Sequence, residues 1–517
     1  MLDLNVITQV KSVLAHLSAH FTFAVERDDS DADATHFSQF VEDVASCSSH
    51  ITVEYRSGKA FRFSILRDGQ DTGIAFRGIP NGHEFTSLLL ALLNADGQGR
   101  NLPDDTLRHR IETLTGNISL KTYVSLTCTN CPDVVQALNV IALLNPHVSH
   151  EMVDGALCQD EVDVLNIQAV PAVYVNGELL HVGRGELGTL LDELEDHLGT
   201  DSSAAHEAVE RHYDVVVLGG GPAGVAAAIY ASRKGQQVAV VAQRIGGQVN
   251  DTTDIENIIS VPKTTGTQLA ADLSKHLEAY PIDTYTNRRI TRVDFSEKDK
   301  RIEVRGGESF IAPRVIIATG AGWCRLGLPG EDKLIGHGIH FCPHCDGPFY
   351  KGKHVAVIGG GNNGVEAAID LAGICKHVTV LEFGDQMRAD KVLQQKLRAL
   401  PNVDIHFHSQ TIGLSEQNGS LNGIDVRDLD KDEVRHITLD GVFVQIGLQP
   451  NSDMFKDHVE LTPCGEIIID NRNRTSAAGV YAAGDVSTVP FKQIMIAMGE
   501  GAKAALAAFE DSLYQEQ

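Results

Sequence analysis

The stretch Val215-Val216-Val217-Leu218-Gly219-Gly220-Gly221-Pro222-Ala223-Gly224 decides the fold of this chain. An apolar strand enters a G-x-G-x-x-G turn, and the turn continues into a helix of small residues. Gly219 permits the tight turn, Gly221 lets the backbone approach a pyrophosphate, and Gly224 allows the helix to pack closely on the strand. The N-terminus of the helix then faces the phosphates. The stretch therefore predicts a dinucleotide-binding unit of the Rossmann type.

The same arrangement occurs a second time, at Val355-Ala356-Val357-Ile358-Gly359-Gly360-Gly361-Asn362-Asn363-Gly364. Gly359, Gly361 and Gly364 repeat the spacing of the first motif, again between an apolar strand and a helix. A single glycine-rich turn is a modest signal, but two in one chain predict that two dinucleotides bind.

An acidic residue about 20 positions after such a turn is expected to bind the ribose hydroxyls. In the second unit the strand Val378–Leu381 ends at Glu382. A carboxylate there accepts hydrogen bonds from a free ribose and repels a 2′-phosphate, and no pair of arginines follows, so this unit favours NADH over NADPH. The first unit has Gln243 in the corresponding place. Glutamine can still hydrogen-bond a hydroxyl, but it departs from the pattern.

Two cysteines two residues apart, Cys342 and Cys345, lie between the two glycine-rich turns. Such a pair can form a small disulfide, open to a dithiol or supply half of a metal site. A zinc cluster is the alternative, and its ligands would come from His337, His340, Cys342, His344 and Cys345. Neighbouring flavin and nicotinamide sites could supply electrons to a reducible disulfide, so we expect redox chemistry and no metal.

A second pair, Cys128 and Cys131, follows the predicted strand Leu120–Leu126 and precedes a predicted helix over 133–144. A cysteine at a helix N-terminus is favoured as thiolate, because exposed N–H groups and the helix dipole stabilise the charge. Farther along, Val170–Pro171 opens a strand that ends in an Asn-Gly hairpin turn. This segment, 101–197, resembles the thioredoxin fold, in which a cis proline packs beside the disulfide.

The first 100 residues contain strands, a proline and a last helix in a similar order, without a cysteine pair. They could be a second, cysteine-poor copy of the same fold, although the internal sequence similarity is weak. Residues 198–211 are small and polar without an apolar stripe, which is typical of a flexible linker.

Composition limits the class of protein. The chain has 517 residues, 43% of them hydrophobic, and a net charge of −26, so it can bury several cores and is expected to repel nucleic acid. The start lacks the pattern of a signal peptide, and no apolar run is long enough to span a membrane. Nine cysteines, four of them in the two pairs, indicate redox chemistry in the cytoplasm.

The end of the chain completes the first dinucleotide unit. Gly484-Asp485 resembles the second flavin signature of disulfide reductases with two dinucleotide domains, in which a strand-terminal aspartate binds the ribityl chain of the flavin. Ala318-Thr319-Gly320 resembles the short motif at which the chain leaves the FAD domain of those enzymes. The resemblance implies an FAD domain formed by 212–326 and 446–517, with an NADH domain (327–445) inserted between them.

Residues 212–517 resemble the low-molecular-weight thioredoxin reductases, whose disulfide also lies in the pyridine-nucleotide domain. The whole chain resembles the family of alkyl hydroperoxide reductase flavoproteins, on the Cys128/Cys131 segment, Asp254-Ile255-Glu256-Asn257, the segment 342–348 and Glu382. This resemblance implies an α/β fold with two Rossmann-type domains preceded by tandem thioredoxin-like folds, over 1–100 and 101–197. It also implies a homodimer whose partner is the peroxiredoxin of alkyl hydroperoxide reductase.

The resemblance further implies a direction of electron flow. Electrons pass from NADH to FAD, then to Cys342/Cys345 and Cys128/Cys131, and finally to the peroxiredoxin, which reduces alkyl hydroperoxides and hydrogen peroxide. Cys345 is expected to face the flavin and Cys342 to exchange with the next pair. Asp346 is a candidate proton donor or acceptor. Such a relay requires that the NADH domain rotates and that the linker lets the N-terminal domain move.

The resemblance also assigns Glu84, in the cysteine-poor half, a role beside the N-terminal disulfide; its alternative is a solvated surface acid. The residues predicted to bind FAD are Gly219, Gly221, Pro222, Ala223, Gly224, Gln243, Gly247, Gln248, Thr319, Gly320, Gly484 and Asp485. Those predicted to bind NADH are Gly359, Gly361, Asn362, Asn363, Gly364 and Glu382. Two other functions remain open on sequence alone. One is a reductase of a free thioredoxin, and the other is a flavin redox sensor without turnover.

Overall fold

The computed structural model describes residues 3–27, 34–58, 60–99, 102–128, 130–199, 209–252, 255–341, 343–417 and 419–515. The chain forms two compact units. One combines Met1–Ser202 with Arg325–Gly447, and the other combines Ser203–Cys324 with Leu448–Gln517. Each unit is therefore built from two separate stretches of sequence.

The N-terminal part of the first unit is one eight-stranded sheet in the order β2-β1-β3-β4-β6-β5-β7-β8. Its strands are β1 (Phe21–Arg27), β2 (Ile51–Ser57), β3 (Arg62–Arg67), β4 (Gln70–Arg77), β5 (Ile118–Val124), β6 (Val148–Asp154), β7 (Ala172–Val175) and β8 (Glu178–Val182). Its helices are α1 (Leu4–Leu14), α2 (Ala34–Ala45), α3 (Phe85–Ala95), α4 (Asp105–Glu112), α5 (Cys131–Leu144), α6 (Gln159–Val164) and α7 (Leu187–Leu198), and a 3-10 turn, η1, covers Gly82–Glu84.

The two halves of this sheet have the same topology. In each half the first strand pairs in parallel with the second and antiparallel with the third, and the third pairs antiparallel with the fourth. The halves join through a parallel pairing of β4 with β6, in which Ile74 lies opposite His150. Shared topology confirms the tandem thioredoxin-like fold that weak internal similarity alone left open.

The remainder of the first unit is a parallel five-stranded sheet with an antiparallel three-stranded sheet beside it. The parallel sheet has the order β18 (Ile339–His340), β25 (Gly441–Val444), β19 (His354–Ile358), β20 (His377–Leu381) and β21 (Val403–His406). The antiparallel sheet contains β22 (Ser409–Gln417), β23 (Ser420–Asp428) and β24 (Glu433–Thr438). The helices are α10 (Glu331–Leu334), α11 (Pro343–Asp346), α12 (Asn362–Ala372) and α13 (Lys391–Arg398), with a 3-10 turn η4 at Gly347–Tyr350.

The second unit is built on a parallel five-stranded sheet, ordered β12 (Ile282–Tyr285), β11 (Val238–Ile245), β10 (Val215–Gly220), β16 (Arg314–Ile317) and β27 (Val480–Ala482). A smaller sheet contains β13 (Ile290–Asp294), β14 (Lys300–Val304), β15 (Glu308–Ala312) and β9 (Val209–His212). Two short strands, β17 (Ala321–Trp323) and β26 (Leu448–Pro450), pair antiparallel with each other. The helices are α8 (Pro222–Ser232), α9 (Gly266–Glu278) and α14 (Ile494–Gln515), with 3-10 turns η3 (Gly247–Asp251) and η5 (Asp453–Phe455).

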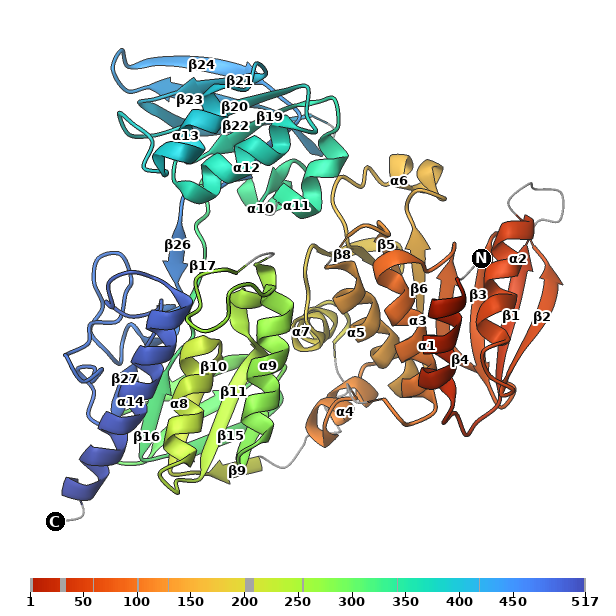
Figure 1. Cartoon of the computed structure of the whole chain (residues 1–517), viewed down its shortest axis with the longest axis horizontal. Helices are drawn as coiled ribbons and strands as arrows, with labels where there is room; N and C mark the ends of the chain where they lie inside the picture. Colours follow the sequence, from red (N-terminus) through yellow and green to blue (C-terminus); the bar gives the residue numbers. More distant parts are fainter. Residues whose placement is uncertain are drawn as a thin grey trace. The chain divides into compact units, whose positions relative to one another are not determined.

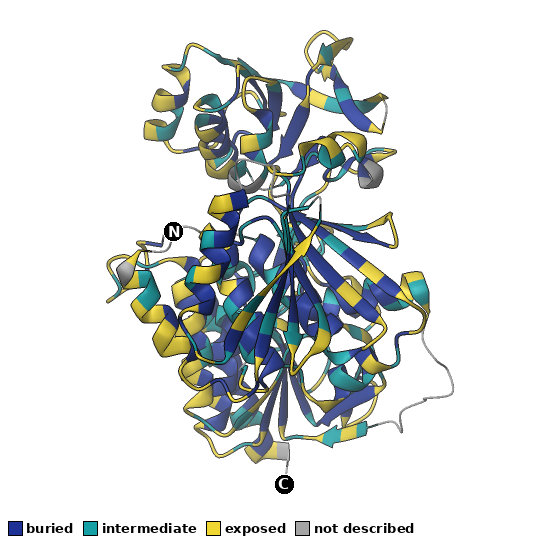
Figure 2. Cartoon of the chain, turned by 90° about the vertical axis from the view of Figure 1, so that its right-hand side faces the viewer, coloured by how far each residue is buried: buried dark blue, intermediate teal, exposed yellow. Residues whose placement is uncertain are grey.

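The central strand β10 is apolar along its whole length because both of its faces are covered. Val215 and Val217 pack in the core beneath α8, α9 and α14 (Figure 1), whereas Val216 and Leu218 pack in the core on the opposite face. Parallel sheets in α/β folds read as continuous apolar runs for this reason. Figure 2 shows the result, with buried strands at the centre and the exposed residues of the helices on the outside.

Two boundaries differ from the sequence prediction. Val209–His212 forms β9, which pairs in parallel with β15, so 209–211 belong to a sheet and not to the predicted linker. Of the other linker residues, 200–208 lie outside the described part of the chain. The helix predicted over 133–144 begins earlier, at Cys131, because Pro132 fits the first helical turn.

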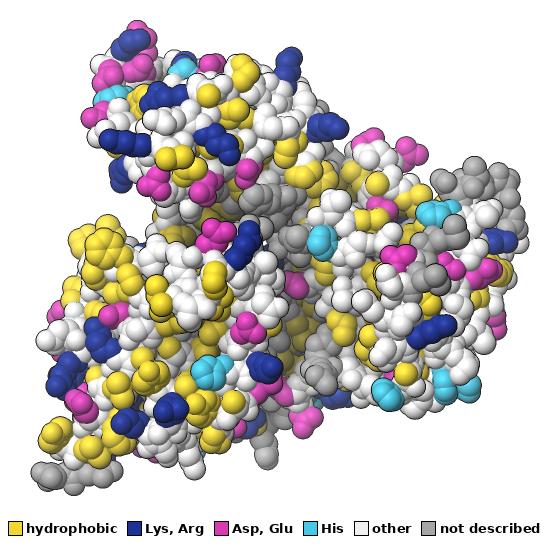
Figure 3. All heavy atoms as spheres, viewed as in Figure 1, with side chains coloured by type: hydrophobic (Ala, Val, Ile, Leu, Met, Phe, Trp, Pro, Cys, Tyr) yellow, Lys and Arg dark blue, Asp and Glu magenta, His cyan; other side chains and the backbone are white. Residues whose placement is uncertain are grey.

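In the face shown in Figure 3, acidic and basic side chains are interspersed, and no single basic region dominates it. In the part of the chain that the structure describes, no helix is long and apolar enough to cross a membrane.

Candidate redox site and nucleotide-binding loops

The first glycine-rich loop connects β10 to α8. Gly219 has φ +114°, and a Cβ there would lie 2.2 Å from the carbonyl oxygen of Ala318. A Cβ on Gly224 would lie 1.9 Å from the carbonyl oxygen of Gly219. By contrast, a Cβ on Gly221 would meet nothing within 4 Å. The first and third glycines are thus required by the chain itself, and the second faces open space of the kind a pyrophosphate needs.

The second loop, between β19 and α12, repeats this geometry. Gly359 has φ +119°, and a Cβ there would lie 2.1 Å from the carbonyl oxygen of Gln445. A Cβ on Gly364 would lie 2.0 Å from the carbonyl oxygen of Gly359, and one on Gly361 would meet nothing within 4 Å. Gly361 caps α12, so Asn362 and Asn363 form its first turn and the backbone N–H groups there face the open side.

The residues that follow each loop differ in their surroundings. Glu382, directly after β20, is buried, and its carboxylate accepts hydrogen bonds from the backbone N–H of Gly360 (2.6 Å) and of Gly384 (2.8 Å). The loop thus fixes the acid beside the glycine-rich turn. Gln243, on β11, is exposed, and its backbone carbonyl accepts from Asn287.

Other predicted FAD residues gather around the first loop. A Cβ on Gly247 would lie 3.1 Å from the Cα of Gly221, and one on Gly484 would lie 3.0 Å from the Cβ of Ala223. Gln248 follows in η3 and is half-buried. Segments far apart in the sequence, before α9 and before α14, therefore meet at the N-terminus of α8.

The surroundings of Asp485 also bear on whether this unit can bind a flavin. Burial raises the pKa of its carboxyl, while the charge of Lys492 acts in the opposite direction. Within the described ranges, the carboxylate has no hydrogen-bond partner. A half-buried carboxylate without a partner, near a loop with an open glycine, fits a ligand that carries both hydroxyl groups and a pyrophosphate, as FAD does.

Thr319 and Gly320 lie where β16 leads into β17. Thr319 Oγ1 donates to the carbonyl oxygen of Asn451 (2.8 Å), and Asn451 Nδ2 donates back to the carbonyl oxygen of Thr319 (2.9 Å). The backbone N–H of Asn451 donates to Gly320 (3.0 Å). These bonds join Thr319 and Gly320, just before β17, to Asn451, just after β26. Asn451 was not predicted because no local motif marks it.

The N-terminal cysteine pair lies at the start of α5. Cys128 and Cys131 are both buried and are free thiols, and the Cys131 backbone N–H points at Cys128 Sγ (3.2 Å). The Val170–Pro171 bond is cis, as the thioredoxin resemblance implied, and the carbonyl oxygen of Val170 lies 3.9 Å from Cys128 Sγ.

The two thiols differ in acidity. The pKa of Cys128 is lowered, first because the Cys131 thiol hydrogen-bonds to it and also because the backbone N–H groups of Asn130 and Cys131 do so; burial and the charge of Asp346 act in the opposite direction. The pKa of Cys131 is raised well above its usual value, chiefly by burial and then by Cys128. Cys128 is therefore the better attacking thiolate of the pair.

Glu84 lies beside this pair and is fully buried, so it is not a solvated surface acid. Its Oε2 accepts a hydrogen bond from Ser87 Oγ (2.7 Å), and Oε1 has no partner in the described part of the chain. Burial raises the pKa of Glu84 to about 7, although the hydrogen bond from Ser87 opposes this, and its charge in turn raises the pKa of Cys131.

The central cysteine pair is only partly described. Cys342 and the side chain of Cys345 lie outside the described residues, as does Asp254. Asp346 is described: it ends α11, and its Oδ2 lies 3.1 Å from Nδ1 of His340. Gln445 was not predicted either. Its Nε2 donates to the carbonyl oxygen of Phe341 (2.9 Å), which ties the second glycine-rich loop to the residue before Cys342.

Contacts within the first unit join the N-terminal sheet to the segment 325–447. The side chains of Asn166 (2.5 Å) and Gln168 (2.9 Å) both donate to Ser420 Oγ at the start of β23. Asn166 and Gln168 lie just before Pro171, on the loop that faces Cys128. The effect of Asp346 on the pKa of Cys128 reflects the same proximity.

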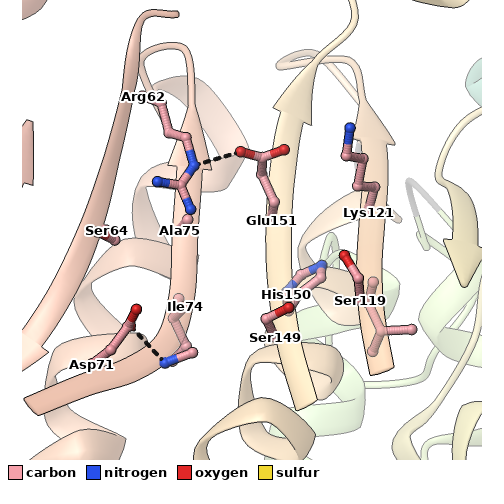
Figure 4. A pocket seen from close by; sticks show the side chains of 12 residues that line it. Arg62, Ser64, Asp71, Ile74, Ala75, Ser119, Lys121, Ser149, His150 and Glu151 are labelled. Carbon is pink, nitrogen blue, oxygen red and sulfur yellow. Dashed lines mark hydrogen bonds and ion pairs between the residues drawn. The ribbon is translucent and has the colours of Figure 1, made fainter. Parts of the chain in front are cut away.

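A pocket on the open face of the N-terminal sheet involves none of the predicted site residues. It crosses the junction of the halves, between β3, β4, β6 and β5, and Figure 4 shows Arg62 reaching Glu151 across it. His150 also lines it, and its ring bonds to Thr122 (2.8 Å) and Asn139 (2.7 Å). Burial lowers the pKa of His150 to about 3, so this histidine is a neutral structural group.

Comparison with known protein families gives two matches. Residues 213–501 match the family described as "Pyridine nucleotide-disulphide oxidoreductase", and residues 118–194 match the family described as "Thioredoxin domain". The first match includes both glycine-rich loops and the central cysteine pair, and the second includes Cys128, Cys131 and Pro171.

Characterised relatives match the chain over nearly its full length. It is 48% identical over 514 residues to the alkyl hydroperoxide reductase F subunit of Pseudomonas putida, and the match covers 99% of this chain and 98% of that one. It is 47% identical over 518 residues to the protein of the same name from Pseudomonas aeruginosa, with the same coverage. The protein of that name from Staphylococcus aureus (strain MRSA252) is 44% identical over 511 residues, covering 99% of both chains.

Solved structures similar to this chain include thioredoxin reductases. The enzyme of Lactococcus lactis ("FR conformation") is 30% identical with a TM-score of 0.55, covering 58% of this chain and 99% of that chain. The enzyme of T. acidophilum is 34% identical with a TM-score of 0.53, covering 59% and 99%.

Proposed function

Because the chain belongs to the family of alkyl hydroperoxide reductase F subunits, within the pyridine nucleotide-disulphide oxidoreductases, we propose that it reduces a bacterial peroxiredoxin with electrons from NADH. The partner peroxiredoxin would then reduce alkyl hydroperoxides and hydrogen peroxide. The chain is a flavin-dependent disulfide oxidoreductase. We also propose the nucleotide that donates the electrons, the residues that transfer them and the partner that receives them.

The nucleotide sites are assigned to the two loops. Gly221, Gly247, Gly484 and Asp485 would hold FAD, and Gly361 and Glu382 would hold the pyridine nucleotide. Bound FAD supplies a centre that accepts two electrons from a nicotinamide and passes them to a disulfide. Glu382 favours NADH, because its buried, ionisable carboxylate would repel a 2′-phosphate.

The N-terminal cysteine pair is the observation that best supports a peroxiredoxin as the electron acceptor. A reductase that used a diffusible thioredoxin would not need a second dithiol in its own chain. Here Cys128, with its lowered pKa, lies beside the cis Pro171, at the start of α5. We assign Cys128 as the thiolate that attacks the disulfide of the peroxiredoxin and Cys131 as the thiol that resolves the mixed disulfide.

This last exchange balances without an added reductant. Cys128 forms a bond to one sulfur of the peroxiredoxin, and the other sulfur leaves as a thiolate. Cys131 then loses its proton and displaces the peroxiredoxin from Cys128. The products are a Cys128–Cys131 disulfide and a peroxiredoxin with two reduced sulfurs, so two electrons have moved, and the proton that Cys131 loses can pass to one of the peroxiredoxin thiolates. Glu84, with a pKa of about 7 next to Cys131, is suited to take that proton and return it.

The test couples the purified chain to a bacterial 2-Cys peroxiredoxin with NADH and hydrogen peroxide. We expect Cys128→Ser to lower peroxiredoxin-dependent NADH oxidation by at least about 100-fold, while anaerobic NADH still bleaches the flavin of the variant. Cys158→Ser is the matched control, because Cys158 is a half-buried free cysteine of the same half. Full coupled turnover by Cys128→Ser would show that electrons leave by another path.

The homodimer and the cytoplasmic location expected from the sequence remain predictions. A dimer would be tested by the molar mass in solution, measured by light scattering on the purified protein.

A further inference from the structure

A buried chain of three polar side chains lies next to the central cysteine pair in the sequence. His340, on β18, has Nδ1 3.1 Å from Asp346 Oδ2 and Nε2 2.7 Å from the hydroxyl of Tyr350. The side chain of His340 is 1% exposed, and that of Asp346 is 13% exposed. The imidazole thus connects a carboxylate near the surface to a hydroxyl in the core.

Aromatic rings enclose the imidazole. The ring of His340 lies 5.2 Å from that of Tyr350 and 5.3 Å from that of Phe443, and the last two rings lie 5.6 Å apart. Gly441 is required for this packing, because a Cβ there would lie 2.3 Å from the Tyr350 ring. Water is therefore kept from both ring nitrogens, and their partners are fixed by the packing.

Among the described residues, few charged groups act on His340, Asp346 and Tyr350. His337 interacts with His340, and Asp440 and Cys375 face Tyr350, while the Lys353 ammonium lies 5.3 Å from the centre of the Tyr350 ring. Burial raises the pKa of the Tyr350 hydroxyl, with Asp346 and Asp440 acting in the same direction. Tyr350 therefore keeps its proton and donates it to Nε2, which leaves Nδ1–H to donate to Asp346.

We propose that His340 is a positioning residue that holds the Asp346 carboxylate in one place through the Nδ1–H hydrogen bond, with Tyr350 fixing the imidazole. This inference rests on the proposed function, because it assigns a task to the acid–base group of the central pair. Asp346 directly follows Cys345, and α11 has only four residues, Pro343–Asp346. The contact with His340 is thus what anchors the end of the redox segment to the sheet.

Proton balance explains why such an anchor is useful. Reduction of the Cys342–Cys345 disulfide to two thiols takes up two electrons and two protons. The later exchange with the Cys128–Cys131 disulfide takes up none overall, since protons lost by one pair appear on the other. A carboxylate next to the pair must nevertheless accept a proton while one thiol attacks and release it afterwards. A carboxylate held in one place does this better than one that turns to solvent.

The test measures thiol reactivity and needs no electron transfer. The full chain carrying Cys128→Ser and Cys131→Ser is reduced with dithiothreitol, and alkylation of Cys342 and Cys345 by iodoacetamide is followed from pH 5 to 10 by peptide mass spectrometry. In His340→Gln we expect the alkylation midpoint to rise by about 0.5 pH unit or more, because the Nδ1–H group no longer screens the negative Asp346 carboxylate and a like charge disfavours a thiolate. Tyr350→Phe should shift it in the same direction by less.

Two further variants separate positioning from general damage to the fold. In the Asp346→Asn background, His340→Gln should have no further effect on the midpoint, because both act through one carboxylate. His354→Gln is the matched control: His354, on β19 of the same sheet, bonds to Thr379 Oγ1 (2.8 Å), and no contact with Asp346 is found among the described residues. An unchanged midpoint in His340→Gln, or an equal shift with and without Asp346, would overturn the proposal. Because no NADH or peroxiredoxin is present, either result is independent of whether the proposed function holds.

Discussion

Glu84 shows how one buried residue can make folding depend on pH. Its pKa is raised by burial from 4.5 to about 7, so the native state binds a proton more tightly than the unfolded chain does. The stability that Glu84 contributes is therefore complete below pH 4.5. It falls as the pH rises toward 7 and is absent above that value. At a pH near 7.5 the chain holds a buried carboxylate next to Cys131 whose only hydrogen bond in the described part of the chain is the one from Ser87.

Replacing this carboxyl should remove that pH dependence. We expect Glu84→Gln to be more stable than the native chain at pH 8, by up to about 3 kcal/mol from the size of the pKa shift, and to show little difference at pH 4.5. Thermal unfolding scans at the two pH values test this. Glu112→Gln, at the exposed end of α4, should change neither midpoint. An equal change in Glu84→Gln at both pH values would mean that ionisation of Glu84 does not limit stability.

Glu382 should decide which pyridine nucleotide is used. The Gly360 and Gly384 N–H groups orient its carboxylate, which should repel a 2′-phosphate. We expect kcat/KM for NADH to exceed that for NADPH by about 100-fold, and Glu382→Gln to narrow the ratio to about 10-fold or less. Steady-state reduction of a small disulfide with each nucleotide measures this. Glu366→Gln, exposed on α12, serves as control, and a native preference for NADPH would contradict the assignment.

At the scale of the element, the strand–turn–helix loops allow a matched pair of substitutions. Gly221→Ala places its Cβ in open space, whereas Gly224→Ala drives its Cβ to 1.9 Å from a backbone carbonyl. We expect Gly221→Ala to fold but to lose FAD on gel filtration, because the methyl group takes the space of the pyrophosphate. Gly224→Ala should either not fold or have a lower unfolding temperature than the native chain. Absorbance at 450 nm and circular dichroism separate the two outcomes, and full retention of FAD by Gly221→Ala would place the pyrophosphate elsewhere.

The elements were predictable where local chemistry dictates them. Both glycine-rich loops follow from their first and third glycines, where a Cβ would meet the backbone, and β7–β8 follows from Asn176-Gly177, both of which have positive φ. The pairing of β4 with β6 was not predictable, because strand periodicity indicates which face of a strand is buried but not which two strands pair along their edges. His340 and Tyr350 were missed as partners for the same reason. They lie on a strand and on a 3-10 turn, and only packing brings them together.

At the scale of the whole molecule, the number of electron-accepting centres can be counted. The proposed relay has one flavin and two cysteine pairs, each of which takes two electrons, so anaerobic titration with NADH should consume roughly six electrons per chain. The chain with Cys128→Ser and Cys131→Ser should consume about four. The flavin spectrum records the end point. A native chain that stops at four electrons would show that one cysteine pair is not in redox contact with the flavin.

The antiparallel pair β17–β26 has a consequence for the ancestry and engineering of the chain. Trp323 lies opposite Leu448 in that pair, so the segment 324–447 leaves and re-enters the second unit at neighbouring positions. Insertion of one domain into a hairpin of another would produce such an arrangement. Removal of this segment should be feasible: an Asn-Gly turn joining Trp323 to Leu448 would form a two-residue hairpin and leave a shortened chain without residues 324–447.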